Sequence, residues 1–197
     1  MPKAGDVSTE SDAELAGAEL ELELEDGMKL DTRQAAAMRE RLLGKLENEN
    51  RAMLRVIEHV PEESLDFKPH DKLRPFNELA THVYNVGMWF VDTVEKGQMD
   101  LAPAAARPPA PLSKATLLQT CQQMGQEIVR RISDLPEPAL VRDIDFARLG
   151  TYQGVTYVDW HLSHLIHHRA QLALYLRMMG AKVPAIYVDS LDYPMQL

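Results

Sequence analysis

Four histidines lie close together near the C-terminal end of the chain: His161, His164, His167 and His168. In an α-helix, which turns by about 100° per residue, His161, His164 and His168 fall within one narrow sector, and His167 lies to its side. Leucines border this sector, so we expect its imidazoles to face the interior of the protein. Side chains four residues apart on a helix meet on one face and can share an ion. The His-x-x-x-His spacing of His164 and His168 therefore predicts a site for a divalent transition metal.

A purely structural role is the alternative for these residues. A single inward histidine is more often a hydrogen-bonded core residue than a metal ligand. A structural role is harder to satisfy for several imidazoles on one stripe of a helix, because without a cation they would compete for the same few hydrogen-bond partners. The cluster as a whole therefore favours metal binding.

A third ligand is expected from another helix, over residues 77–96, which ends at Gly97. His82 shares a face of this helix with Leu79 and Val86, so it should point inward. Alone it would be an ordinary core residue, but beside an inward His-x-x-x-His pair it becomes the predicted third ligand. Three protein ligands that leave coordination positions open are typical of a catalytic metal, whereas a closed set of four is typical of a structural one.

The predicted metal on His82, His164 and His168 would activate a bound water or a thiol. A divalent cation lowers the pKa of bound water towards ~7 and deprotonates a coordinating thiol. His161 lies one turn before the ligand pair on the same face and is the candidate catalytic residue, as a proton-transfer group or as a support for the ligands. A structural histidine bonded to a neighbouring carbonyl oxygen is the alternative for His161.

Three neighbours of the predicted ligands have other expected roles. His167 is expected at the surface or between helices. Arg169 and Gln171 are expected to fix helix or subunit packing, although an arginine beside a metal site could also anchor an anionic thiol cofactor.

A non-catalytic protein that stores or senses a metal or ligand would explain the same residues and is the second functional hypothesis. An open coordination position beside an accessible pocket would favour the enzyme. The sequence patterns of several other enzyme classes are absent from the chain. The chain has no Glu-x-x-His pattern of the di-iron type, no glycine-rich phosphate loop and no nucleophile elbow.

The elements that must position the histidines are predicted to be four helices, so the expected fold class is all-α. Their apolar stripes and end signals place them at residues 31–59, 77–96, 113–135 and 156–179. For the last helix, Thr156 and Asp159 form a plausible capping box, and Gly180 is a typical helix-ending residue. Proline-rich connections are expected at residues 61–75 and 101–112, and a loop with at most a short extended piece is expected at 139–155.

Bulk composition restricts the class of protein. A chain of 197 residues with 45% hydrophobic content is large enough for one domain with a real core. We expect no membrane span, because no apolar run approaches ~20 residues, and the absence of a secretory signal predicts a cytoplasmic protein. The single cysteine, Cys121, is expected to be a buried structural thiol. The net charge of −9 disfavours nucleic-acid binding.

Most of the net charge lies in the first 31 residues. They contain ten acidic and two basic residues, a balance of −8. The run AELELELE at residues 18–25 alternates like a strand but consists of residues that prefer helix. We therefore expect residues 1–30 to be a flexible acidic extension, or an arm that orders against a partner, and residues 31–197 to form the helical bundle.

One stretch of the sequence resembles a known family. The run HLIHHRAQL at 164–172, followed by YLRMMG at 175–180 and VP at 183–184, resembles the His-x-x-x-His-Arg-Gly-Gln…Tyr-Leu-Arg…Gly…Pro pattern of the DinB-like superfamily of four-helix-bundle metalloenzymes. The segment ELATH at 78–82 resembles the second-helix histidine segment of that family. Ala170 stands where the family often has glycine. The acidic extension has no counterpart in the family.

The resemblance implies an up-down-down-up bundle, a zinc or nickel-type divalent ion and a homodimer. Similar proteins include transferases that use low-molecular-weight thiols and a thiol-dependent maleylpyruvate isomerase. Fold similarity alone is a weak guide to chemistry. The sequence therefore predicts a metal-dependent enzyme, a thiol S-transferase or a hydrolase, that acts on a small-molecule substrate.

Overall fold

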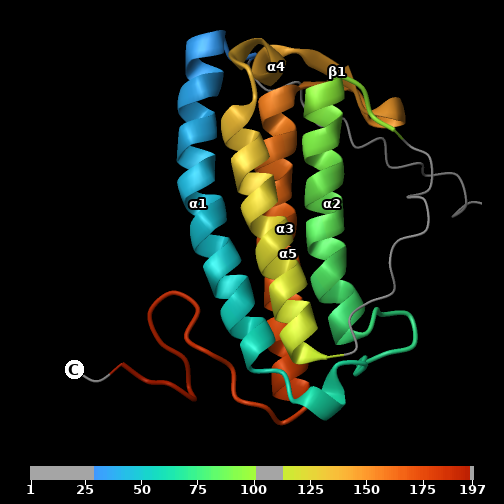
Figure 1. Cartoon of the computed structure of the whole chain (residues 1–197), viewed down its shortest axis with the longest axis vertical. Helices are drawn as coiled ribbons and strands as arrows, with labels where there is room; N and C mark the ends of the chain where they lie inside the picture. The colour runs from blue at the N-terminus through green and yellow to red at the C-terminus, as the bar shows by residue number, and fades with distance from the viewer. Residues whose placement is uncertain (1–28, 101–112, 196–197) are drawn as a thin grey trace, which may run out of the picture.

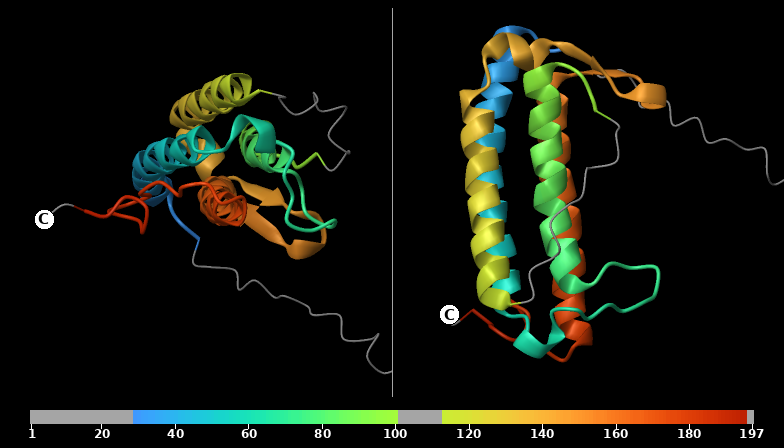
Figure 2. Two further views of the ribbon diagram at one scale, coloured as in Figure 1. Left: turned by 90° about the horizontal axis from the view of Figure 1, so that it is seen from below. Right: turned by 45° about the vertical axis from the view of Figure 1, so that its right-hand side comes forward.

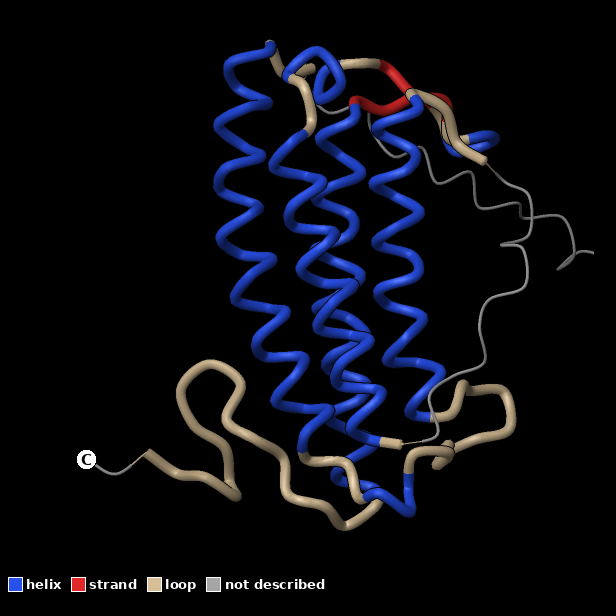
Figure 3. Tube along the Cα trace, in the orientation of Figure 1, coloured by secondary structure: helices blue, strands red, loops and turns tan. Residues whose placement is uncertain are grey.

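The computed structural model describes residues 29–100 and 113–195. Four long helices run side by side in this part of the chain (Figures 1 and 3): α1 (Thr32–Glu58), α2 (Phe76–Lys96), α3 (Lys114–Asp134) and α5 (Gly154–Met178). Shorter elements complete the fold: η1 (Glu62–Ser64), α4 (Glu137–Val141), β1 (Asp143–Asp145), η2 (Ala147–Leu149) and β2 (Thr151–Gln153). The predicted all-α class is thus confirmed.

The four long helices form a bundle with up-down-down-up topology. Both α1 and α2 pack against α3 and against α5, as the end-on view in Figure 2 shows. Helices α1 and α5 run in one direction and α2 and α3 in the other (Figure 1). The segment predicted to connect α2 and α3, residues 101–112, lies outside the described residues.

Apolar stripes from all four helices meet in the centre of the bundle. Leu46 and Met53 of α1, Ile128 of α3 and Leu165 of α5 are among the residues with no exposed surface. Burying an aliphatic side chain of this size contributes about 1.5–3 kcal/mol each to stability, so these contacts hold the helices together. Cys121 is also fully buried, as predicted.

The ends of three long helices follow the predicted signals within about one residue. Asp31 caps α1 in a reciprocal pair with Gln34, in which each side chain accepts a hydrogen bond from the backbone N–H of the other. Ser113 caps α3 by accepting from the N–H of Thr116. Gly97 ends α2 with φ 71°, a left-handed conformation that glycine adopts without strain.

The predicted start of the histidine helix was wrong by two residues. Helix α5 begins at Gly154 after Gln153, and Thr156 lies inside its first turn instead of capping it. The reason is a β-hairpin, in which β1 and β2 pair antiparallel and lead directly into the helix. At Gly154 the backbone passes so close to α4 that a Cβ atom would lie 2.2 Å from the carbonyl oxygen of Ala139.

The hairpin and α4 occupy most of the segment predicted as a loop. They cover one end of the bundle (Figure 1) and are joined to the start of α1. The Gln153 side chain accepts a hydrogen bond from the N–H of Leu30 (2.8 Å) and donates one to its carbonyl oxygen (2.9 Å). Lys29 forms an ion pair with Asp143 at 2.6 Å. The start of the first helix is therefore fixed to the start of the last.

The C-terminal segment packs back on the bundle. Its Ile186 carbonyl oxygen accepts a hydrogen bond from Arg55 of α1 (2.8 Å), and its Asp192 forms an ion pair with Arg177 of α5 (2.7 Å). None of the helices in the described ranges has the length and apolarity needed to cross a bilayer. The predicted acidic extension lies mostly outside the described residues.

Candidate metal centre

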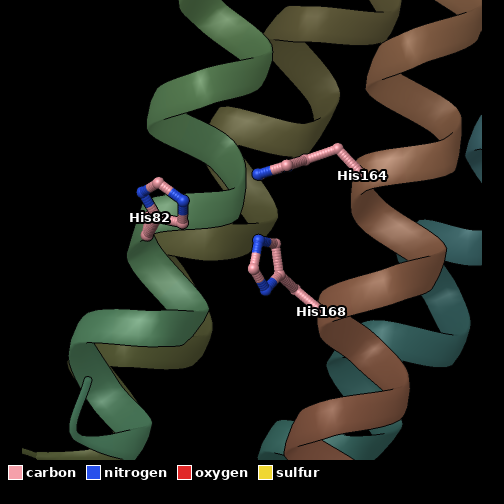
Figure 4. A group of neighbouring side chains, drawn as sticks. All are labelled: His82, His164 and His168. Carbon is pink, nitrogen blue, oxygen red and sulfur yellow. The ribbon is translucent and has the colours of Figure 1, made fainter. Parts of the chain in front are cut away.

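The three predicted ligands come together between α2 and α5. Figure 4 shows His82 on α2 and His164 and His168 on α5 with their rings around one shared space. Each can offer a ring nitrogen such that the three nitrogens all lie within 4.8 Å of one another. The ring centroids of His164 and His168 are 4.3 Å apart, and each lies 5.2 Å from that of His82.

The two helices position these rings for different reasons. The spacing of four residues places His164 and His168 one above the other on the same face of α5. Packing of α2 against α5 then brings His82 opposite the pair. All three side chains are half-buried, so the rigid bundle holds them while the site stays within reach of solvent.

Burial keeps His164 and His168 uncharged at neutral pH. Desolvation, and next the neighbouring His168 and His82, lower the pKa of His164 to about 3. Desolvation also lowers the pKa of His168, although its hydrogen bond to Gln171 acts in the opposite direction. A neutral imidazole has a free lone pair for a metal ion, whereas a protonated one has none.

Gln171 fixes the orientation of His168. The Nδ1–H of His168 donates to Oε1 of Gln171 (2.7 Å), which leaves the Nε2 lone pair of the ring free. The amide of Gln171 in turn contacts Nε2 of the exposed His167 at 3.1 Å. The expectation for Gln171 was helix or subunit packing, so its contact with a ligand was missed. The spacing of three residues between His168 and Gln171 was the available signal.

The residues present fit a transition-metal ion. Nδ1 of His164 is buried and has no hydrogen-bond partner among the described residues. A coordinated ion would satisfy such an atom, which otherwise carries a desolvation cost. Three imidazole nitrogens suit zinc or nickel, whereas magnesium and calcium prefer oxygen ligands.

His161, the candidate catalytic residue, lies deeper in the bundle and is not one of the three grouped ligands. Its side chain has no exposed surface, and neither ring nitrogen has a hydrogen-bond partner in the described part of the chain. The ring fits against α2 only because residue 87 is glycine, since a Cβ there would lie 2.4 Å from Cε1 of His161. Desolvation lowers the pKa of His161 to about 4, so the ring is neutral. The alternative prediction, a hydrogen bond from His161 to a neighbouring carbonyl oxygen, is not met, because neither ring nitrogen has such a partner in the described residues.

An aromatic cluster lies towards the hairpin from the three histidines. Its centre is Trp160, one turn before His164 on α5. The Trp160 ring lies 4.9 Å from that of Tyr152, 5.1 Å from that of Tyr157 and 5.4 Å from that of Phe146, measured between centroids. These rings pack against one another between the first turns of α5 and the hairpin.

Arg169 is directed away from the ligands and joins two helices. Its Nε donates to Glu49 of α1 at 2.8 Å, and its Nη2 donates to the hydroxyl of Tyr187 at 2.7 Å. That hydroxyl donates in turn to Glu49 (2.8 Å). The predicted packing role of Arg169 is confirmed within the chain. Its partners were not recognisable in the sequence, because Glu49 lies 120 residues away.

Comparison with known proteins supports the same fold. The sequence model of the DinB family matches residues 32–195. A crystal structure of a DinB-like protein from Bacillus subtilis, YjoA, superposes with a TM-score of 0.63 at 18% identity and covers 74% of this chain and 97% of its own. A crystal structure of a DinB-like protein from Bacillus cereus superposes with a TM-score of 0.62 at 18% identity. It covers 75% of this chain and 97% of its own. No curated protein was found to match the chain.

Proposed function

The chain belongs to the DinB family, and we propose that it is a metal-dependent enzyme whose ion is held by His82, His164 and His168. The observation that carries this proposal is the convergence of three ring nitrogens within 4.8 Å of one another in a half-buried site. Three ligands leave coordination positions for a substrate, as in catalytic zinc sites. Zinc and nickel are the ions that this donor set suits best.

The proposed reaction is thiol S-transfer or hydrolysis of a small molecule. A bound divalent ion would supply a water or low-molecular-weight thiol of lowered pKa as the nucleophile. The protein itself contributes His164 and His168 in their neutral forms, since burial lowers the pKa of both, and it fixes the ring orientation of His168 through Gln171. His161 is the proposed proton-transfer group.

Metal content is the first test. Wild-type protein purified without a histidine tag should contain about one zinc or nickel per chain by elemental analysis. His164→Ala should lose this metal. His167→Ala is the matched control, because His167 is exposed and outside the ligand group, and it should keep the metal. Stoichiometric metal in purified His164→Ala would show that the ligands are wrongly assigned.

Turnover separates the enzyme from a metal-storing or metal-sensing protein. The metal-loaded wild type should accelerate the reaction of a low-molecular-weight thiol with a chromogenic electrophile, or the hydrolysis of an activated ester, and His164→Ala should not. A protein that binds its metal fully but accelerates neither reaction would support the non-catalytic alternative. Assembly as a homodimer and a cytoplasmic location stay predictions, which light scattering and cell fractionation can test.

A further inference from the structure

A pocket lies between α1 and α3, outside the metal centre. Its volume is about 500 Å³, within the usual range for small-molecule sites. Tyr84, Cys121 and Gly125 are among the residues that line it, and no metal-ligand histidine does. Tyr84 follows His82 by two positions on α2, a rotation of about 200°, so the two side chains face different sides of the bundle.

We propose that this pocket binds a neutral small molecule through a hydroxyl group. The main evidence is that two polar atoms among its lining residues are buried without a hydrogen-bond partner in the described residues. They are the hydroxyl of Tyr84, a residue with no exposed surface, and Oδ1 of Asn50. Buried polar atoms without partners are rare in folded proteins, because desolvation is then uncompensated. A ligand in the pocket would supply the missing partners.

Gly125 allows both of these side chains to lie directly against α3. A Cβ atom at this position would lie 3.1 Å from Cε1 of Tyr84 and 3.3 Å from Cγ of Asn50. The tyrosine and the asparagine thus meet at one point of α3, where any larger residue would displace them. A ligand hydroxyl that reached both polar atoms could accept from the hydroxyl of Tyr84 and donate to Oδ1 of Asn50, which a purely apolar group could not do.

The buried part of the pocket is uncharged. Burial raises the pKa of the Cys121 thiol to about 12, and it also raises the pKa of Tyr84. Both groups therefore stay protonated at neutral pH. An ionic group placed against them would lose its hydration without gaining a counter-ion.

The remaining lining residues also favour a neutral ligand with an apolar body. Leu54 and Val129 offer apolar surface. The charged residues of the pocket balance, two acidic against two basic: Glu47, Asp134, Arg51 and Arg130. Arg130 is held at 2.7 Å by Glu127 and at 2.8 Å by Asp134, which reduces its attraction for an anion.

Phenol and toluene are the matched probes for this proposal, because they share a ring but only phenol has a hydroxyl group. Each would be titrated into the full-length, metal-loaded protein while the backbone amide signals of Cys121 and Gly125 are followed by NMR. Phenol should shift these signals saturably. Tyr84→Phe should weaken phenol binding by about three- to tenfold, the effect of one lost hydrogen bond, and change toluene binding less than twofold.

Two glycine variants test the location. Gly125→Ala should weaken phenol binding, since the new Cβ narrows the space beside Tyr84 and Asn50. Gly44→Ala is the matched control, because this helix residue has nothing within 4 Å of an added Cβ. His164→Ala should bind phenol like the wild type if the pocket is independent of the metal centre.

Three results would overturn the proposal. The first is the absence of saturable shifts at Cys121 and Gly125, which would mean that the buried atoms are met by water alone. The second is equal phenol affinity in wild type and Tyr84→Phe. The third is loss of the phenol shifts in His164→Ala, which would place the probe in the metal centre.

Discussion

His161 is fully buried, and neither of its two ring nitrogens has a hydrogen-bond partner among the described residues. With a folded-state pKa of about 4, it stays neutral where an unfolded chain, with an ordinary histidine pKa of 6.5, would already bind a proton. Such a residue costs stability in acid, so its retention in the core next to the ligand turn suits a functional role. The sequence placed it on the inward face of the helix but could not indicate how completely it is enclosed.

The stability of the metal-free protein should therefore fall as the pH is lowered from about 6.5 to about 4. In this range the unfolded chain takes up a proton that the folded chain excludes, and His161 alone should account for roughly 3 kcal/mol. His164 and His168 shift in the same direction. Thermal melts at several pH values should show a shallower dependence for His161→Gln. The same dependence of stability on pH in wild type and His161→Gln would contradict the lowered pKa of His161.

The same variant tests the proposed proton transfer. His161→Gln should keep the metal, because residue 161 is not among the grouped ligands. Turnover of a substrate identified in the activity screen should drop by about 10²-fold or more if His161 moves a proton. Normal turnover with lowered stability would instead assign it a structural role.

Gln171 should tune the metal affinity through His168. Gln171→Leu removes the acceptor that fixes the His168 ring, and residues that orient metal ligands typically contribute about 10- to 100-fold in affinity. Competition with a chromogenic chelator would measure the change. Gln126→Leu, on the exposed surface of α3, is the matched control and should not alter the affinity. An unchanged metal dissociation constant in Gln171→Leu would mean that packing alone orients His168.

At the scale of elements, the contact between α1 and α5 depends on a buried ion pair. The Arg169 and Glu49 side chains are only 6% and 9% exposed. Glu49→Gln would leave the guanidinium charge without its counter-ion, which typically costs about 3–5 kcal/mol. Urea unfolding should show this loss. The double variant Glu49→Leu, Arg169→Met should recover most of it, because no charge is then buried; a double variant as unstable as the single would contradict this explanation.

Long and short elements differed in how well they could be predicted. Each long helix contains several turns of apolar repeat and local end signals, so α1, α2 and α3 were placed within about one residue. The hairpin and α4 are too short for a repeat to emerge. Gly154 was not recognisable as a helix start. A glycine is needed there because a side chain would collide with Ala139 of α4, and this contact is not visible in the sequence. The grouping of His164 and His168 could be predicted because their i,i+4 pattern is local, whereas the partners of Arg169, Glu49 and Tyr187, lie in other segments of the chain.

At the scale of the whole molecule, the acidic extension should be dispensable for the fold. Deleting residues 1–28 should leave the melting temperature and the metal content unchanged, because the core stripes begin after Asp31. Deleting residues 1–30 should cost about 1 kcal/mol or more, since the hydrogen bonds between Leu30 and Gln153 are lost. A large fall in the melting temperature of the variant that lacks residues 1–28 would show that leucines of the extension pack against the bundle.

The separation of the metal ligands along the chain also determines when the site can form during synthesis. His82 leaves the ribosome with the first half of the protein, while His164 and His168 follow near its C-terminal end. Until α5 has been made, α1 and α2 both lack one of the two helices against which they pack. A nascent chain that ends before α5 has one of the three ligands and no tight binding position. Metal loading at the proposed site would therefore be a late event, which follows the release and docking of the last helix.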